Sequence, residues 1–134
     1  MARSPEKEKV HDSRGNLSDR IRSFYDESSL LWEQVWGEHM HHGHYGVDGT
    51  SREKDPRTAQ RILIDKLLEW SRPKSVQQIL DVGCGIGGST LYLASKYYAN
   101  ATGITLSPRQ AARATARARA SGLDPHVEFL VANA

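Results

Sequence analysis

Apolar and polar positions from residue 56 onward alternate in the order typical of an α/β protein. Short apolar runs predict strands, and stretches with apolar residues three or four positions apart predict helices. The predicted elements are, in order, strand 78–82, helix 89–98, strand 101–106, helix 108–121 and strand 127–131. This β-α-β-α-β order predicts one half of a doubly wound parallel sheet.

A further helix is predicted before the first strand. Asp55-Pro56 suits its first turn, and Pro73 marks its end. Its buried stripe is expected to consist of Ile62, Leu63, Leu67 and Trp70. Between residues 17 and 36, helical spacing of aromatic and aliphatic residues predicts two short helices that meet around Asp26–Ser29.

These patterns divide the chain into three parts. Residues 1–16 lack apolar periodicity and are expected to form a mobile tail. Residues 17–55 form an N-terminal helical cap or lid segment that includes a loop rich in glycine and histidine. Residues 56–134 form a partial, Rossmann-like α/β domain.

Strand 78–82 should be central in such a sheet, but no residues remain to form a strand on its far side. An exposed apolar edge invites association with another chain. We therefore expect either an N-terminal fragment of a longer protein (or a truncated gene product), or self-association that covers this edge.

Composition narrows the possible partners and compartments. The chain has 134 residues and a net charge of +2, which is too small to argue for nucleic acid as a partner. Arg109, Arg113, Arg117 and Arg119 are interpreted as a solvated surface. No apolar stretch is long enough to predict a transmembrane segment. A lone cysteine fits a reducing compartment and a cytoplasmic location, with a plastid or a peripheral membrane association as alternatives.

The most informative motif is Ile79-Leu80-Asp81-Val82-Gly83-Cys84-Gly85-Ile86-Gly87-Gly88, a strand that ends on a glycine-rich turn. Such turns aim backbone N–H groups at nucleotide-like cofactors. The carboxylate of Asp81 would repel a pyrophosphate but suits an ammonium or a sulfonium. The next strand runs into Ser107-Pro108 without the acidic residue that NAD sites use for the ribose. Both features favour S-adenosylmethionine over NAD, while a plain strand–turn–helix joint remains the alternative.

Four histidines lie within six residues: His39, His41, His42 and His44. No carboxylate or cysteine pattern nearby completes a set of metal ligands, so no metal site is predicted.

Three segments resemble the class I S-adenosylmethionine-dependent methyltransferases, and most of all the gamma-tocopherol methyltransferase family. They are Phe24–Gly43, Leu80–Ser89 and Gly103–Pro108, the last followed by Gln110. The resemblance covers the chain from about Ser18 onward and lacks the back half of the family's domain.

The resemblance implies a set of cofactor contacts around the methionine, ribose and adenine of S-adenosylmethionine, with one tyrosine closing over them. The residues are Tyr25, Asp81, Gly83, Cys84, Gly85, Gly87, Thr105, Leu106, Gln110 and Asn133. His41, His42 or Tyr45 would orient a phenol or act as a base.

The implied activity is methyl transfer to a small-molecule acceptor, a tocopherol-like phenol ring carbon and hence lipophilic. A small amine is a second acceptor class, since relatives of this group methylate nitrogen. A truncated, non-catalytic cofactor-binding module and an NAD-binding oxidoreductase fragment are the rival hypotheses.

Overall fold

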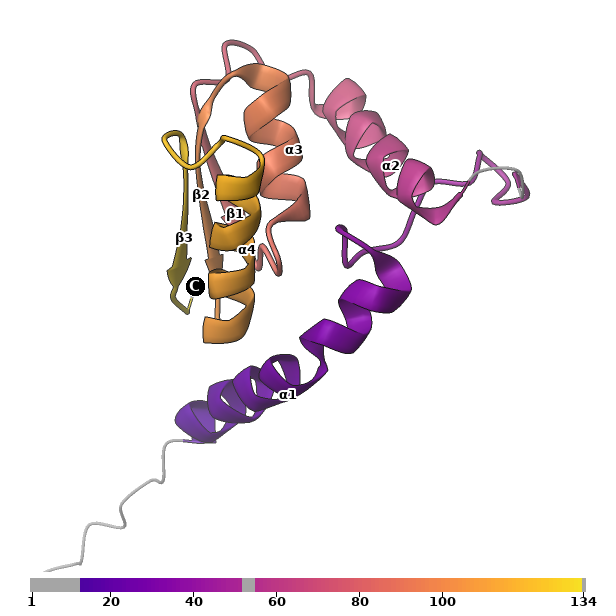
Figure 1. The fold of residues 1–134 in the computed structure, drawn as a ribbon. Coiled ribbons are helices and arrows are strands. Elements are labelled where there is room, and N and C mark those ends of the chain that lie inside the picture. Colours follow the sequence, from indigo (N-terminus) through magenta and orange to yellow (C-terminus); the bar gives the residue numbers. More distant parts are fainter. Residues whose placement is uncertain (1–12, 52–54, 134) are drawn as a thin grey trace, which may run out of the picture.

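The computed structural model describes residues 13–51 and 55–133 (Figure 1). Its elements are α1 (Ser13–Trp36), α2 (Pro56–Ser71), β1 (Gln78–Val82), α3 (Gly88–Tyr97), β2 (Asn100–Thr105), α4 (Pro108–Ala120) and β3 (Val127–Val131). The predicted α/β order is confirmed, and the bounds of β1 and β3 agree with the sequence prediction.

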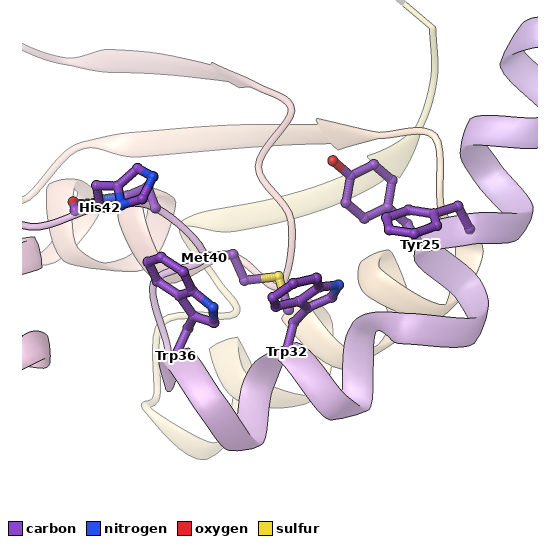
Figure 2. A pocket seen from close by; sticks show the side chains of 7 residues that line it. Tyr25, Trp32, Trp36, Met40 and His42 are labelled. Atoms are coloured by element: carbon purple, nitrogen blue, oxygen red, sulfur yellow. Dashed lines mark hydrogen bonds between the residues drawn. The ribbon is translucent and has the colours of Figure 1, made fainter.

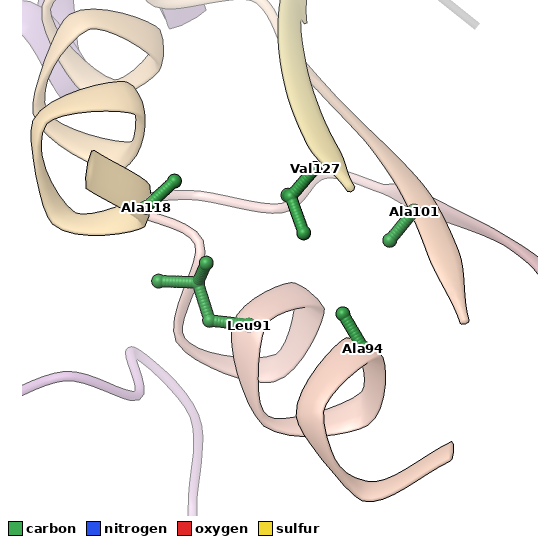
Figure 3. Close-up of a cluster of buried hydrophobic side chains, with 5 residues drawn as sticks. All are labelled: Leu91, Ala94, Ala101, Ala118 and Val127. Carbon is green, nitrogen blue, oxygen red and sulfur yellow. The ribbon is translucent and has the colours of Figure 1, made fainter. Parts of the chain in front are cut away.

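The three strands form a parallel sheet in the order β1-β2-β3. Helices α3 and α4 pack on one face of it (Figure 1). The core between these layers is built from small and medium apolar side chains (Figure 3): Leu91, Ala94, Ala101, Ala118 and Val127. Alanines let the helices approach the strands closely, which brings the turn between β1 and α3 near the end of β2.

Helix α1 is one continuous helix, so the prediction of two short helices is wrong. The hydroxyls of Ser28 and Ser29 donate to the carbonyls of Phe24 and Tyr25, four residues earlier, and so remain compatible with the helix. The helix already includes Ser13, inside the predicted tail, while residues 1–12 of that tail lie outside the described residues.

Helix α2 begins where Asp55 predicts. The Asp55 side chain accepts hydrogen bonds from the backbone N–H groups of Arg57 and Thr58, at 3.0 and 3.1 Å. The predicted buried stripe is wrong at Leu67 and Trp70, which are 56% and 83% exposed.

The buried residues of α2 are Ala59 and Gln60 in its first half and Ile64 just past its midpoint. The first half packs on the loop after α1, where His44 N–H donates to the Ala59 carbonyl at 2.8 Å. The second half of α2 faces α3 through Asp65, whose Oδ1 accepts from the Tyr92 hydroxyl at 2.8 Å and from Lys96 Nζ at 2.9 Å, while Leu67 and Trp70 lie on a side that is left in solvent.

Strand β1 is an edge strand of this sheet, and its apolar side chains on the face away from α3 and α4 are uncovered. Leu80 is 65% exposed and Val82 is 59% exposed. Among the described residues, no helix is both long enough and apolar enough to span a membrane.

Candidate cofactor site

The glycine-rich turn lies at the carboxyl end of β1 and adopts the left-handed conformations that glycine permits. Gly83 and Gly85 have φ angles of 78° and 55°. The N–H groups of Gly83 and Cys84 both donate to the Ile104 carbonyl, at 2.9 and 3.0 Å. The turn is therefore fixed to the end of β2, where the next predicted cofactor contacts begin.

Asp81 is held in place by α3. Its Oδ2 accepts a hydrogen bond of 2.6 Å from the hydroxyl of Thr90, which is fully buried. The half-buried carboxylate lines a pocket of about 110 Å³ over the turn, together with Gly83, Cys84, Gly85 and residues of the loop after α1. A negative charge at this point favours a cationic ligand group.

A second pocket, of about 200 Å³, lies at the end of β2. Thr105 and Gln110 are buried there, and the Thr105 hydroxyl donates to Gln110 Oε1 at 2.8 Å. Leu106 completes the α/β side of this pocket, while Ile21 and Tyr25 of α1 form the opposite wall. The pocket is thus closed by side chains far apart in the sequence.

A third pocket, of about 230 Å³, lies against α1 and is mainly aromatic (Figure 2). Its lining residues are Phe24, Tyr25, Trp32, Trp36, Met40, His41 and His42. Met40 also lines the other two pockets, Tyr25 the second and His41 the first. The three pockets therefore adjoin at Met40, and we refer to them together as the crevice.

His41 presents a hydrogen-bond acceptor at this junction. Its Nδ1 lies 2.8 Å from the His42 carbonyl, which can only accept, so Nδ1 carries the proton and donates. The remaining ring nitrogen, Nε2, then has a free lone pair; it is buried and has no partner among the described residues. A neutral imidazole of this tautomer can accept a proton from a phenol.

His39 lies deeper, against the start of α3. Burial, with a smaller contribution from His41, lowers the pKa of His39 to about 4, so its ring is neutral at physiological pH. A side chain at Gly88 would place its Cβ only 2.1 Å from the Glu38 carbonyl oxygen, so glycine is required for the loop to pack there. In the described part of the chain, no three histidine, cysteine, aspartate or glutamate side chains are grouped as metal ligands.

The structure brings most of the predicted site residues together in the crevice. They are Tyr25, His41, His42, Asp81, Gly83, Cys84, Gly85, Thr105, Leu106 and Gln110. Cys84 is buried beneath the turn, and burial together with the Asp81 charge raises the pKa of its thiol to about 12. It is a packing residue rather than a reactive thiol.

Three predicted residues lie elsewhere. Gly87 packs beneath the turn, where an added Cβ would be 2.6 Å from the Phe129 ring. Asn133 is exposed, and its Nδ2 donates to the Ser18 hydroxyl at 3.5 Å. Tyr45 belongs to the loop after the aromatic pocket and is not among the residues that line it.

Sequence reasoning missed two residues that shape the crevice. Met40 lies at the junction of its pockets, but a lone methionine carries no pattern. The buried Gln60 amide nitrogen lies 3.3, 2.6 and 2.9 Å from the carbonyls of Trp36, His39 and His41 and so fixes the loop backbone. In the sequence Gln60 looks like any polar position of a surface helix.

Comparison with known proteins gives the same picture. The family profile of mycolic acid cyclopropane synthetase matches residues 12–133. A probable chloroplastic tocopherol O-methyltransferase from Oryza sativa subsp. japonica is 48% identical over 126 residues, which are 88% of this chain and 34% of that protein. A chloroplastic tocopherol O-methyltransferase from Arabidopsis thaliana is 45% identical, over 88% of this chain and 36% of that protein.

Solved structures share the fold. The [4+2]-cyclase SpnF is 32% identical with a TM-score of 0.74, covering 87% of this chain and 42% of that one. A geranyl diphosphate methyltransferase in complex with GPP and sinefungin is 26% identical with a TM-score of 0.70, covering 88% of this chain and 49% of that one.

The chain spans about one third of the length of the curated relatives it matches. The predicted incomplete Rossmann-like fold and the predicted resemblance are both confirmed. With its glycine-rich turn, its Asp81 carboxylate and a family profile that matches residues 12–133, the chain belongs to the mycolic acid cyclopropane synthetase family of S-adenosylmethionine-dependent methyltransferases.

Proposed function

We propose that this chain is the cofactor-binding portion of a small-molecule methyltransferase that uses S-adenosylmethionine. The observation that carries the proposal is the Asp81 carboxylate, which Thr90 holds beside the glycine-rich turn. A carboxylate at this point pairs with the ammonium of the cofactor's methionine part, whereas it would repel the pyrophosphate of NAD. The pocket at Thr105 and Gln110 suits the ribose and adenine, since both side chains offer hydrogen-bonding groups.

When bound, the cofactor supplies an electrophilic methyl group on a sulfonium. The chain's own residues bind and orient: Asp81 fixes one end of the ligand, and Tyr25 covers the other. The aromatic pocket adjoins the pocket over the glycine-rich turn at Met40 and His41, so an acceptor held there would lie next to the bound cofactor. Catalysis of this kind depends mainly on proximity and orientation.

The proposed acceptor is a lipophilic phenol of the tocopherol type, methylated on a ring carbon. Trp32 and Trp36 offer flat apolar surfaces for an aromatic ring. His41 would accept the phenol proton and make the ring more nucleophilic; the buried Nε2 without a partner among the described residues supports this role. The names of the relatives from Oryza and Arabidopsis, both tocopherol O-methyltransferases, support an acceptor of the tocopherol type and a plastid location, and they do not bear on methylation at a ring carbon.

Two alternatives follow from specific observations. An ajmaline N-methyltransferase from Rauvolfia serpentina is 36% identical over 87% of this chain, which supports a small amine as acceptor. Because the chain spans about one third of its tocopherol methyltransferase relatives, a non-catalytic cofactor-binding module is the other alternative.

The test is calorimetric titration of the 134-residue chain with S-adenosylhomocysteine, with NAD as the competing cofactor class. We expect saturable binding of S-adenosylhomocysteine alone, and an Asp81→Asn variant that binds roughly tenfold more weakly or worse. Asp124→Asn, which neutralises an exposed carboxylate in the turn before β3, is the matched control. A folded chain that binds neither ligand, or equal affinity in both variants, would contradict the proposal.

The acceptor is tested separately, by methyl transfer from S-adenosylmethionine to gamma-tocopherol or to a secondary amine of the ajmaline type. Ring methylation that slows in His41→Gln supports the phenol, whereas N-methylation supports the amine. Cofactor binding without transfer to either acceptor supports the non-catalytic module.

A further inference from the structure

We infer that three sets of polar contacts along α4, which we call the rungs of a ladder, hold α1 closed over the crevice, and that Arg113 is thereby a positioning residue for the cofactor. Arg109, Arg113 and Arg117 follow one another at intervals of four residues, so they lie along one side of α4. The inference rests on the proposed function, since a lid changes affinity only if the crevice binds the cofactor.

The first rung joins Asp26 of α1 to the start of α4. Asp26 Oδ1 accepts hydrogen bonds from the Ser107 hydroxyl at 2.5 Å and from the Arg109 N–H at 3.3 Å. The Asp26 carbonyl also accepts from Arg109 Nη1 at 3.1 Å. A carboxylate in this position interacts favourably with the positive end of the helix dipole.

The second rung is a two-nitrogen contact between Arg113 and Glu33. Arg113 Nη2 lies 2.6 Å from Glu33 Oε1, and Nε lies 2.9 Å from Oε2. The Arg113 guanidinium lowers the pKa of Glu33, which keeps this carboxylate ionised. A paired fork of this kind fixes orientation as well as distance.

The third rung anchors the loop after α1. Arg117 Nη2 lies 3.3 Å from Glu38 Oε1, and Nη1 donates to the carbonyls of Glu38 and Ile86 at 3.3 and 3.1 Å. The loop residues His39, Met40 and His41 that follow Glu38 belong to the crevice, so this rung ends at the site itself.

Polar contacts are important here because the apolar residues of α1 are largely unburied. Leu17, Leu31 and Val35 are 56%, 61% and 67% exposed. Their exposure leaves little apolar area to hold α1 against α4. Exposed ion pairs are individually weak, so a lid held by such rungs is reversible and sensitive to salt.

The ladder is directly connected to the cofactor walls. Asp26 is the neighbour of Tyr25, which lines the pocket at Thr105 and Gln110. Ser107, which donates to Asp26, also accepts from the Gln110 N–H at 3.0 Å. Moving α1 away would therefore remove the Tyr25 wall and disturb the residues opposite it.

The experiment is calorimetric titration with S-adenosylhomocysteine of four proteins: the 134-residue chain, Arg113→Glu, the charge swap Glu33→Arg/Arg113→Glu, and Arg119→Glu. Arg119 is an exposed arginine of the same helix two residues beyond Arg117, on another side of α4. We expect Arg113→Glu to bind roughly five- to tenfold more weakly, and the swap and Arg119→Glu to stay within about twofold of the unmodified chain.

Rescue by the swap separates positioning from a general loss of structure, because both proteins carry the same substitution at Arg113. Raising NaCl from about 50 to about 500 mM should weaken binding several-fold in the unmodified chain and by a smaller factor in Glu33→Leu/Arg113→Leu, which keeps the Arg117–Glu38 pair. Unchanged affinity in Arg113→Glu, or a swap that stays as weak as the single variant, would overturn the ladder. An unmodified, folded chain that does not bind at all would overturn the proposed function instead.

Discussion

We expect the free energy of unfolding to fall at acidic pH, and His39 to be a main cause. This side chain is only 5% exposed, and its Nδ1 has no hydrogen-bond partner among the described residues. Its ring packs edge-on against Tyr92, with ring centroids 6.4 Å apart. Burial, followed by the His41 charge, lowers the pKa of His39 from 6.5 to about 4. The native state therefore resists taking up a proton that the unfolded chain accepts.

The sign follows from proton binding in the two states. The contribution of His39 to stability is fully present above pH 6.5 and declines as the pH falls from 6.5 towards 4, because the unfolded chain binds the proton first. The pKa difference corresponds to roughly 3 kcal/mol of unfolding free energy lost by pH 4, and about 2 kcal/mol of it is lost between pH 7 and pH 5. That loss is a large share of the stability of a small domain.

The assay is urea denaturation followed by circular dichroism at pH 7 and pH 5. His39→Gln lowers stability at both pH values, but its loss on acidification should be about 2 kcal/mol smaller than that of the unmodified chain. His126→Gln, which removes an exposed imidazole before β3, should keep the full acid sensitivity. If His39→Gln loses as much stability as the unmodified chain between the two pH values, the buried neutral imidazole is not the cause.

Two further predictions concern the turn. Gly88→Ala should lower the unfolding free energy, measured by urea denaturation, by about 1–3 kcal/mol, because the added Cβ would lie 2.1 Å from the Glu38 carbonyl oxygen. Ser95→Ala, on the exposed side of α3, is the control in the same assay. Cys84, with a thiol pKa of about 12, should react with a disulfide reagent at pH 8 roughly a hundredfold or more slowly in the native chain than in denaturant; equal rates would contradict its burial.

The parts of the fold that follow from local sequence could be predicted closely. Strand β1 and the start of α2 are encoded by neighbouring residues, an apolar run before glycines and a capping aspartate before proline. Packing between elements could not be predicted in the same way. Leu67 and Trp70 have the spacing of a buried stripe, but nothing in the sequence indicates that this side of α2 is left in solvent.

The candidate site also contains a part that the local sequence predicts and a part that it does not. Asp81 and the glycines occur together in one short motif, so their grouping is visible in the sequence. The partners that give them their geometry are distant or unpatterned: Thr90 comes nine residues after Asp81, and Gln60 fixes a loop about twenty residues earlier. The resemblance to a known family predicted Tyr25, Gln110 and Gly87 as cofactor contacts. The structure places Tyr25 and Gln110 in the crevice, but Gly87 packs against other side chains of the chain instead.

The arginines of α4 show why long-range pairing resists prediction. Taken alone, Arg109, Arg113 and Arg117 look like a solvated helix face, and their pattern contains no information about α1. Their acidic partners lie about eighty residues earlier, on α1 and in the loop that follows it, and the apolar residues of α1 are themselves largely exposed. The crevice therefore depends on two kinds of interaction, local ones that fix the turn and long-range ones that hold α1. The glycine-rich turn is fixed by its neighbours in the sequence and by hydrogen bonds to the end of β2, whereas the wall formed by α1 depends on polar groups that meet only in the folded chain. Substitution of Arg113, which pairs with Glu33 of α1 and, within the described residues, makes no hydrogen bond to the turn, should then alter cofactor affinity more than global stability.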